Sequence, residues 1–314
     1  MGMVFLNKTL LTEGESIPAP LFVTWFQCVV TAAIVIALGT LGANSPKQSF
    51  FAQFPQFEYD IATAQKVMPL SVVFVLMIAL NNLCLQYVEV SFYQVARGLT
   101  TVFNVVLSYV FLNEATSRRA LVCCALIIFG FYIGVENEVN FTLIGTVFGV
   151  TSSLFVCLNA MYTKKVYPLV DNNQWRLALY NNLNAVLLFP PIILLTGEDL
   201  VLLEHGPLLR SPDYWMKMLT AGLFGFLIGI VIVFQITLTS PLTHNVAGTA
   251  KATLQTFIAL AVYRNPITAK GALGIFFILL GSSLYTYVRS EEMNEAAKAA
   301  SKRVSESADK KEPA

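Results

Sequence analysis

The chain is built from long runs of apolar residues separated by short polar breaks. A helix needs about 20 apolar residues to cross a hydrocarbon core about 30 Å thick. The apolar positions are continuous along each run and do not alternate, which favours helices over the strands of a membrane barrel. Nine runs reach or approach the required length: 19–42, 67–88, 91–113, 119–135, 142–163, 175–196, 214–238, 243–263 and 270–290. The pattern therefore predicts an all-α integral membrane protein with nine full transmembrane helices.

Composition agrees with this pattern. Hydrophobic residues make up 56% of the 314 residues and charged residues 12%, whereas soluble domains carry about 25% charged residues. The net charge of +1 gives no reason to expect a nucleic-acid partner. All five cysteines fall inside expected spans, which argues against a disulfide framework. The lipid bilayer is the surrounding that the sequence predicts.

The second half of the chain repeats the first at a spacing of 151 residues. Shifted by this amount, whole spans and single polar or small positions coincide. The coinciding pairs include 91–113 with 243–263, 119–135 with 270–290, Val95-Ala96 with Val246-Ala247, Asn104 with Gln255, and Gly130 with Gly281. Fewer than half of the residues match, so the agreement of spans and loops carries the inference.

The repeat predicts an architecture of five helices followed by five helices. The first repeat, 1–141, holds only the end of its first helix, at Met1 to Leu11, and the second repeat is 142–290. Five is an odd number, so the two copies cross the membrane in opposite senses. Inverted repeats of this kind are typical of secondary transporters, whose site lies near the midplane between the halves. Residues 291–314 are polar and are expected to form a disordered tail.

The distribution of basic residues predicts the orientation. With the C-terminus in the cytosol, the cytosolic segments hold thirteen Lys and Arg residues and the opposite side holds five. Cytosolic loops carry the excess of positive charge in membrane proteins. The tail is therefore expected on the cytosolic side.

Two cations, Arg97 and Lys251, lie inside expected spans that contain no acidic residue. Each belongs to a polar stripe on one helix face: Gln94, Arg97, Thr101, Asn104 and Ser108 in the first span, and His244, Gly248, Lys251 and Gln255 in the second. A charge at membrane depth is costly and usually faces a cavity or a substrate path. A guanidinium beside an ammonium suits phosphate oxygens. The stripes therefore predict a substrate that carries a diphosphate.

A second polar cluster consists of Tyr180, Asn181, Asn182 and Asn184 in the span 175–196. Carboxamides offer the paired donors and acceptors that a nucleobase edge requires. Hydrogen bonding between helices is the structural alternative. No metal-ligand cluster, nucleophile motif or phosphate-binding loop is present in the sequence, so neither an enzyme, a resident metal nor a cofactor is expected.

Several segments resemble the nucleotide-sugar transporters of the drug/metabolite transporter superfamily, most closely the Golgi GDP-fucose transporters. These segments are Pro69-Leu70-Ser71-Val72-Val73-Phe74, Gly98-Leu99-Thr100-Thr101-Val102-Phe103-Asn104, Gly145-Thr146-Val147-Phe148-Gly149-Val150 and Ser240-Pro241-Leu242-Thr243-His244-Asn245-Val246. The resemblance implies a multi-pass antiporter of the Golgi membrane. It would import GDP-fucose from the cytosol in exchange for GMP from the lumen, by alternating access.

The resemblance also implies site residues. The guanine-contacting Phe-Tyr-Asn-Asn motif of GDP-sugar transporters falls on Leu179-Tyr180-Asn181-Asn182, so its first position departs. The Gly-Ala-Leu-Asn-Lys motif of GDP-mannose carriers has a shorter counterpart here, which favours fucose over mannose. That counterpart is Gly248-Thr249-Ala250-Lys251, and His244 and Asn245 just upstream are the candidates for the sugar. Arg97 and Lys251 are the candidates for the phosphates.

Two other readings stay open at this point. A carrier for GDP-mannose or a sugar phosphate needs the same two cations. A truncated, non-transporting membrane protein has the same spans without a ligand. The sequence also leaves open whether the chain forms a homodimer.

Overall fold

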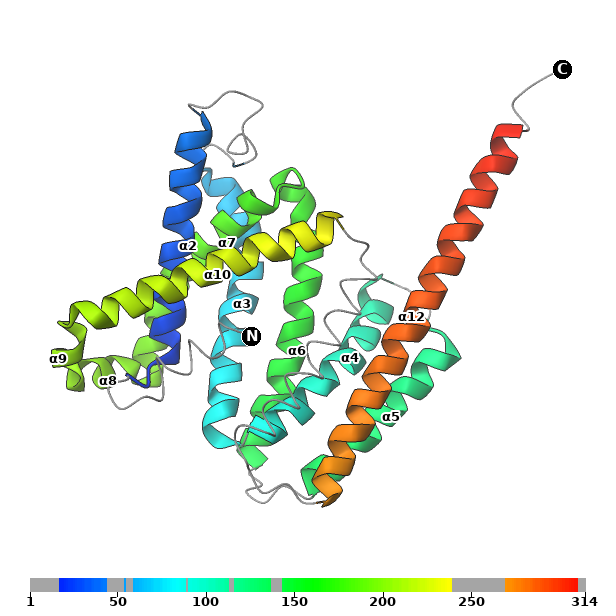
Figure 1. The fold of residues 1–314 in the computed structure, drawn as a ribbon, viewed down its shortest axis with the longest axis horizontal. Helices are drawn as coiled ribbons and strands as arrows, with labels where there is room; N and C mark the ends of the chain where they lie inside the picture. The colour runs from blue at the N-terminus through cyan, green and yellow to red at the C-terminus, as the bar shows by residue number, and fades with distance from the viewer. Residues whose placement is uncertain are drawn as a thin grey trace. The chain divides into compact units, whose positions relative to one another are not determined.

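The computed structural model describes residues 17–43, 54, 59–88, 90–112, 116–136, 143–238 and 269–309. Within these ranges every regular element is a helix (Figure 1). The elements are α2 (Pro20–Ala43), α3 (Ile61–Tyr87), α4 (Val90–Leu112), α5 (Arg118–Glu136), α6 (Leu143–Val166), the 3-10 turn η2 (Tyr167–Val170), α7 (Gln174–Thr196), α8 (Glu198–Glu204), α9 (Gly206–Leu209), α10 (Pro212–Leu238) and α12 (Ala269–Asp309). The all-α prediction is confirmed for this part of the chain.

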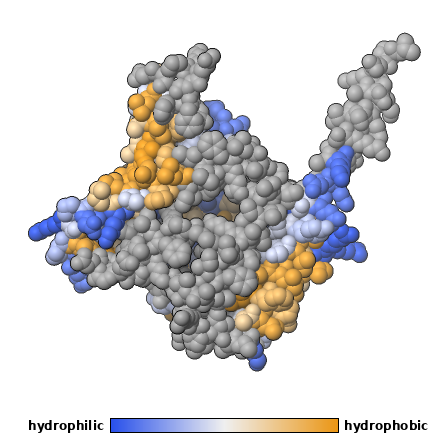
Figure 2. Space-filling view, viewed as in Figure 1, coloured by the Kyte–Doolittle hydropathy of each residue, from blue (hydrophilic) through white to orange (hydrophobic). Residues whose placement is uncertain are grey.

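Each expected span coincides with one helix, apart from 243–263, which lies outside the described residues. Five helices of the described ranges are long and apolar enough to cross a membrane: Pro20–Ala43, Ile61–Cys84, Leu143–Thr163, Gln174–Thr196 and Lys270–Glu292. Large apolar side chains are exposed along them, and Figure 2 shows hydrophobic surface along α2 and α12. Water-exposed apolar area of this extent is unusual for a soluble monomer. The fold is that of a multi-pass membrane protein.

Two boundaries differ from the sequence expectation. Helix α3 begins at Ile61, because the carboxylate of Asp60 caps it by accepting hydrogen bonds from the backbone N–H groups of Ala62 and Thr63 at 3.1 and 3.0 Å. The tail was expected to be disordered, but α12 continues to Asp309. Residues 291–309 are rich in Ala, Glu and Lys, which are strong helix formers and extend a helix that the membrane span has already nucleated.

The helices form two compact units, and each unit combines helices from both halves of the sequence. One unit holds α2, α3, α6, α7 and α10, and the other holds α4, α5 and α12. The repeat boundaries expected from the sequence are therefore not the boundaries of the compact units. Each unit is described by itself below.

In the first unit, α7 packs on α2 and on α3, and α3 also packs on α6. A buried cluster joins α2, α3 and α7 through Leu21, Cys28, Val75, Ala79, Ala185, Phe189 and Ile193. Asn173 caps the start of α7, because its side-chain oxygen accepts from the N–H groups of Trp175 and Arg176, and Gly197, whose φ of 76° suits a glycine, caps its end. These caps fix where the face of α7 points.

Glu198 ties the end of α7 to the start of α2. Its buried carboxylate accepts hydrogen bonds from the backbone N–H groups of Leu21 at 3.0 Å and Phe22 at 2.9 Å. A carboxylate at this position satisfies unpaired N–H groups and complements the helix dipole. Further along, Nε1 of Trp25 donates to the carbonyl oxygen of Val186 at 3.1 Å. The two helices are therefore antiparallel and held in a fixed register.

In the second unit, α5 and α12 cross through glycines that bring their backbones together. A Cβ added at Gly130 would lie 2.8 Å from the carbonyl oxygen of Gly274 and 2.9 Å from the backbone nitrogen of Ile278. A Cβ added at Gly281 would lie 3.1 Å from the carbonyl oxygen of Cys123 and 3.2 Å from the backbone nitrogen of Ile127. The residues in these contacts form three pairs separated by 151 residues: Gly130 with Gly281, Cys123 with Gly274, and Ile127 with Ile278. The helix pair thus has the two-fold relation that an inverted repeat requires.

Candidate substrate-binding site

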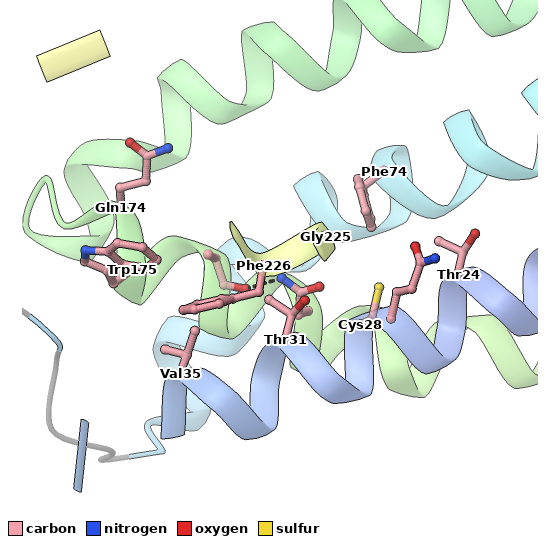
Figure 3. A pocket seen from close by; sticks show the side chains of 12 residues that line it. Thr24, Cys28, Thr31, Val35, Phe74, Gln174, Trp175, Gly225 and Phe226 are labelled. Atoms are coloured by element: carbon pink, nitrogen blue, oxygen red, sulfur yellow. Dashed lines mark hydrogen bonds between the residues drawn. The ribbon is translucent and has the colours of Figure 1, made fainter. Parts of the chain in front are cut away.

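A cavity of about 260 Å³ opens inside the first unit, between α2, α3, α7 and α10. Figure 3 shows Trp175, Phe226 and Thr31 around it, with the ring of Phe74 reaching in from α3. The lining residues are Thr24, Gln27, Cys28, Thr31, Val35, Phe74, Gln174, Trp175, Ala178, Asn182, Gly225 and Phe226. The cavity lies within the apolar spans α2 and α7.

The lining positions are related by the internal repeat. Eight of the twelve form four pairs separated by 151 residues: Thr24 with Trp175, Gln27 with Ala178, Thr31 with Asn182, and Phe74 with Gly225. Both repeats therefore present equivalent positions to a single cavity. Transporters with inverted repeats bind substrate at the interface between the repeats. Within the first unit, the cavity is lined by helices from both of the expected repeats.

Helical spacing explains how the sequence presents these side chains. On α2, Thr24, Gln27, Thr31 and Val35 follow steps of three, four and four residues, which place them on one face. On α7, Trp175, Ala178 and Asn182 follow steps of three and four residues, and the cap at Asn173 fixes the first turn from which they start. The two polar faces meet across the cavity.

The wall of the cavity combines aromatic rings with carboxamides. The ring of Trp175 lies 6.0 Å from that of Phe226 and 4.8 Å from that of Phe54, centroid to centroid. Gln27, Gln174 and Asn182 supply amide donors and acceptors, and none of the described residues that line the cavity is charged. Sites that enclose whole drug-sized ligands occupy about 300–1,000 Å³. The described wall therefore suits a flat group with a hydrogen-bonding edge.

Asn182 is the member of the Tyr180-Asn181-Asn182 cluster that lines this cavity. Its Nδ2 donates to the carbonyl oxygen of Ala178, one turn earlier in the same helix, at 2.8 Å. Its side-chain oxygen accepts no hydrogen bond from the part of the chain that the structure describes. That oxygen is available to accept a hydrogen bond from a ligand.

The structure places Tyr180 and Asn181 against α3, away from the cavity wall. Tyr180 is buried, and its hydroxyl oxygen accepts a hydrogen bond from the backbone N–H of Asp60 at 3.0 Å. The side-chain oxygen of Asn181 accepts from the hydroxyl of Ser71 at 3.0 Å. Asn184 adds a third link, since its Nδ2 donates to the carbonyl oxygen of Ala64 at 3.0 Å. These contacts fix α7 on α3 and thereby fix the direction of Asn182.

Arg97 lies on α4, in the second unit. Its guanidinium carbon is 6.0 Å from the centroid of the Tyr93 ring, one turn away, and this contact is a cation–π interaction. The side chain is half-buried and makes no ion pair with a carboxylate of the described ranges. Along the same stripe, Thr101 and Ser108 are half-buried and Asn104 is exposed. The remaining expected site residues, His244, Asn245, Gly248, Thr249 and Lys251, lie outside the described residues.

Sequence reasoning missed the α2 wall and the aromatic residues. Gln27, Thr31, Trp175 and Phe226 were not expected in a site, although Thr31 is the residue that the 151-residue shift pairs with Asn182. Applying the repeat to single polar residues of the second half would have pointed to α2. Trp175 and Phe226 carry no comparable signal, because aromatic residues are common throughout such spans.

Comparison with known proteins shows the relatives of the chain. The model of the Triose-phosphate Transporter family matches residues 1–286. A GDP-fucose transporter 1 of Nematostella vectensis is 48% identical over 300 residues, covering 94% of this chain and 87% of that protein. A GDP-fucose transporter 1 of Mus musculus is 48% identical over 299 residues, covering 94% and 81%. A protein of Drosophila melanogaster named GDP-fucose transporter, Golgi, is 43% identical over 295 residues, covering 92% and 86%.

Proposed function

This chain belongs to the Triose-phosphate Transporter family, and from that premise we propose that it carries GDP-fucose across the Golgi membrane. Membership makes it a transporter and not an enzyme. GDP-fucose is supported by the names of relatives that are 43–48% identical over most of the chain. The Golgi membrane is supported by the name of the Drosophila relative and by the apolar helices.

The observation that carries the proposal is the neutral cavity at the interface of the repeats, with Asn182 on its wall. Guanine is flat, uncharged and rich in hydrogen-bonding groups on one edge. The rings of Trp175 and Phe226 offer it apolar faces, and the side-chain oxygen of Asn182 on the cavity wall accepts from its N1–H group. Tyr180 and Asn181 act as positioning residues that hold α7 against α3.

The diphosphate requires cations, which the described residues of the cavity wall do not supply. We assign the phosphates to Arg97 and Lys251, with Gly248 and Thr249 beside Lys251, and the sugar to His244 and Asn245. An unpaired cation in a membrane span is costly until an anion neutralises it. Ligand binding therefore favours closure of the site. This cost is the physical reason for exchange. The occluded state of the empty carrier has a high free energy, and bound GMP lowers it for the return step.

The remaining element of the proposal concerns orientation. The thirteen Lys and Arg residues expected on the side of the tail, against five on the other, support a cytosolic C-terminus. GDP-fucose then enters from the side of the tail and GMP leaves toward it.

Uptake into proteoliposomes tests the proposal. Vesicles that contain the purified protein and internal GMP should take up radiolabelled GDP-fucose several-fold faster than vesicles without GMP. Asn182→Ala should reduce uptake about tenfold, the value of one hydrogen bond of about 1.5 kcal/mol to the ligand. Thr196→Ala, an exposed position at the end of the same helix, serves as the control. Equal rates with and without internal GMP would refute exchange, and inhibition by UDP-sugars as strong as by GDP-sugars would refute guanine recognition.

A further inference from the structure

We propose that Gln27 of α2 is a second base-reading residue, which acts together with Asn182 of α7 to select guanine. The inference rests on the proposed function, because it assigns a further contact to the same bound base. Gln27 is 8% exposed and lines the cavity, in a helix that is otherwise mostly apolar. A carboxamide in a membrane span is costly unless its polar groups are used.

The α2 face presents few polar groups to the cavity, and Gln27 is the long one among them. The hydroxyl of Thr24 donates to the carbonyl oxygen of Pro20 at 2.8 Å, so its hydrogen is used within its own helix. Cys28 and Val35, which line the same face, are weakly polar and apolar. The carboxamide of Gln27 offers two donor hydrogens and two acceptor lone pairs. It can therefore bind a neighbouring protein group and a ligand at the same time.

The helix register brings Gln27 and Asn182 to nearly the same depth. The side chain of Trp25 on α2 donates a hydrogen bond to the backbone of Val186 on α7. Because the two helices are antiparallel, counting residues along each helix from this contact places Asn182 between the levels of Gln27 and Thr31. Two residues of helix correspond to about 3 Å along the axis. The two carboxamides thus face one cavity from two helices, at depths that differ by less than the length of a purine.

The two carboxamides do not occupy equivalent positions of the internal repeat. Positions 27 and 178 are equivalent, as are positions 31 and 182. In the first pair the carboxamide belongs to α2 (Gln27 and Ala178), and in the second it belongs to α7 (Thr31 and Asn182). Each carboxamide is thus matched by a smaller residue on the other helix. The smaller residues leave room in the cavity for a ligand that presents a different polar edge to each carboxamide.

Guanine has one more polar group on its pairing edge than a single carboxamide can match. The edge carries the O6 acceptor and the N1–H and N2–H donors, whereas one carboxamide offers a single oxygen beside a single NH₂ group. Two carboxamides cover the whole edge, with the oxygen of Gln27 accepting from the 2-amino group and the oxygen of Asn182 accepting from N1–H. The consequence is a preference for guanine over hypoxanthine, which lacks the 2-amino group, and over uracil.

Competition by nucleoside monophosphates against GDP-fucose uptake tests this inference. The inhibition constants of GMP, IMP and UMP against GDP-fucose uptake are measured for the wild type and for Gln27→Met, which keeps the length of the side chain and removes its amide. In the wild type GMP should compete about tenfold better than IMP, which corresponds to one hydrogen bond. In Gln27→Met the difference between GMP and IMP should largely vanish. Thr40→Ala, at an exposed position of α2 outside the cavity, should keep it.

The outcomes separate a contact role from a structural one. A Gln27 that only joined helices would weaken GMP and IMP by the same factor, and an unchanged ratio in Gln27→Met therefore overturns the inference. Binding measured as nucleotide-dependent thermal stabilisation in detergent supplies the same ratio for a variant that no longer transports. If Gln27→Met keeps the ratio while Asn182→Ala loses guanine preference, the inference fails and the proposed function stands. If GMP does not compete in the wild type, the proposed function itself fails.

Discussion

The hydroxyl of Tyr180 accepts a hydrogen bond from the backbone N–H of Asp60 at 3.0 Å, across 120 residues of chain. Asp60 in turn caps α3. The contact therefore joins the middle of α7 to the first turn of α3, and it uses the hydroxyl group that a substrate would otherwise meet. A tyrosine beside two asparagines suggested a base site in the sequence, but in the structure this tyrosine orders a helix start.

Tyr180→Phe should lower stability without changing base selectivity. The substitution keeps the buried ring and removes one hydrogen bond, worth about 1 kcal/mol. The thermal midpoint in detergent should fall by a few degrees, while the ratio of GMP to IMP inhibition constants stays at the wild-type value. A changed ratio would show that Tyr180 touches the base. Tyr287→Phe, at an exposed position of α12, is the matched control.

Gly130→Ala should be more destabilising than Gly281→Ala. A methyl group at position 130 meets backbone atoms of α12 at 2.8 and 2.9 Å, which cannot move aside. At position 281 the nearest atom, at 2.7 Å, belongs to the side chain of Ile127. We expect a loss of about 1–3 kcal/mol for Gly130→Ala, as for overpacked cores. Thermal unfolding measures both variants, and Gly206→Ala, with no atom within 4 Å of the added carbon, should be neutral. Equal losses at positions 130 and 281 would contradict the close backbone contact.

Glu198 should make stability depend on pH. Burial raises the pKa of its carboxyl group, and this effect outweighs the two backbone N–H groups that lower it. The folded protein therefore binds this proton more tightly than the unfolded chain does. The contribution to stability is complete below the ordinary glutamate pKa of about 4.3 and is lost as the pH rises through the raised value.

Glu198→Gln removes that titration. The thermal midpoint of the wild type, measured from pH 4 to pH 8, should contain a fall that the variant lacks. The variant also loses one of the two acceptors for the start of α2, so its midpoint should be lower at every pH. Asp199→Asn, the neighbouring residue in α8 and half-buried, controls for the loss of a charge in this helix. An unchanged pH profile in Glu198→Gln would show that other groups cause the fall.

Cys28 should report occupancy of the cavity. It lines the cavity, whereas Cys84, Cys123, Cys124 and Cys157 do not, and all five are free thiols. A membrane-permeant maleimide should label Cys28 several-fold more slowly when GMP is bound, because the ligand blocks access. Peptide mass spectrometry follows each site, and Cys157 serves as an internal control in the same sample. Equal protection of both thiols would indicate general tightening and not occupancy.

Local patterns predicted the helices but not their contacts. The apolar runs identified each described span because membrane helices have a length set by the bilayer. The start of α3 was missed, since Asp60 becomes a cap only through its own side chain. The helical tail was missed because composition alone does not show that α12 supplies a ready nucleus for it.

The residues expected from the sequence and those that line the cavity overlap only at Asn182, for a similar reason. Asn182 was identified from its residue type, and its place on the cavity wall agrees with a binding role. Its neighbours Tyr180 and Asn181 have equally suitable chemistry, but they point to α3 because adjacent helical residues face different directions. Gln27 lies about 150 residues away in the sequence, so only the packing of α2 on α7 reveals that it shares a cavity with Asn182.

The crossing of α5 and α12 at Gly130 and Gly281 has a mechanical consequence. Each contact there is the image of another under exchange of the two repeats. If each repeat adopts the conformation of the other during transport, the contacts at this crossing are replaced by equivalent contacts. The crossing can therefore act as a pivot: the same glycines stay in contact while the rest of the second unit moves.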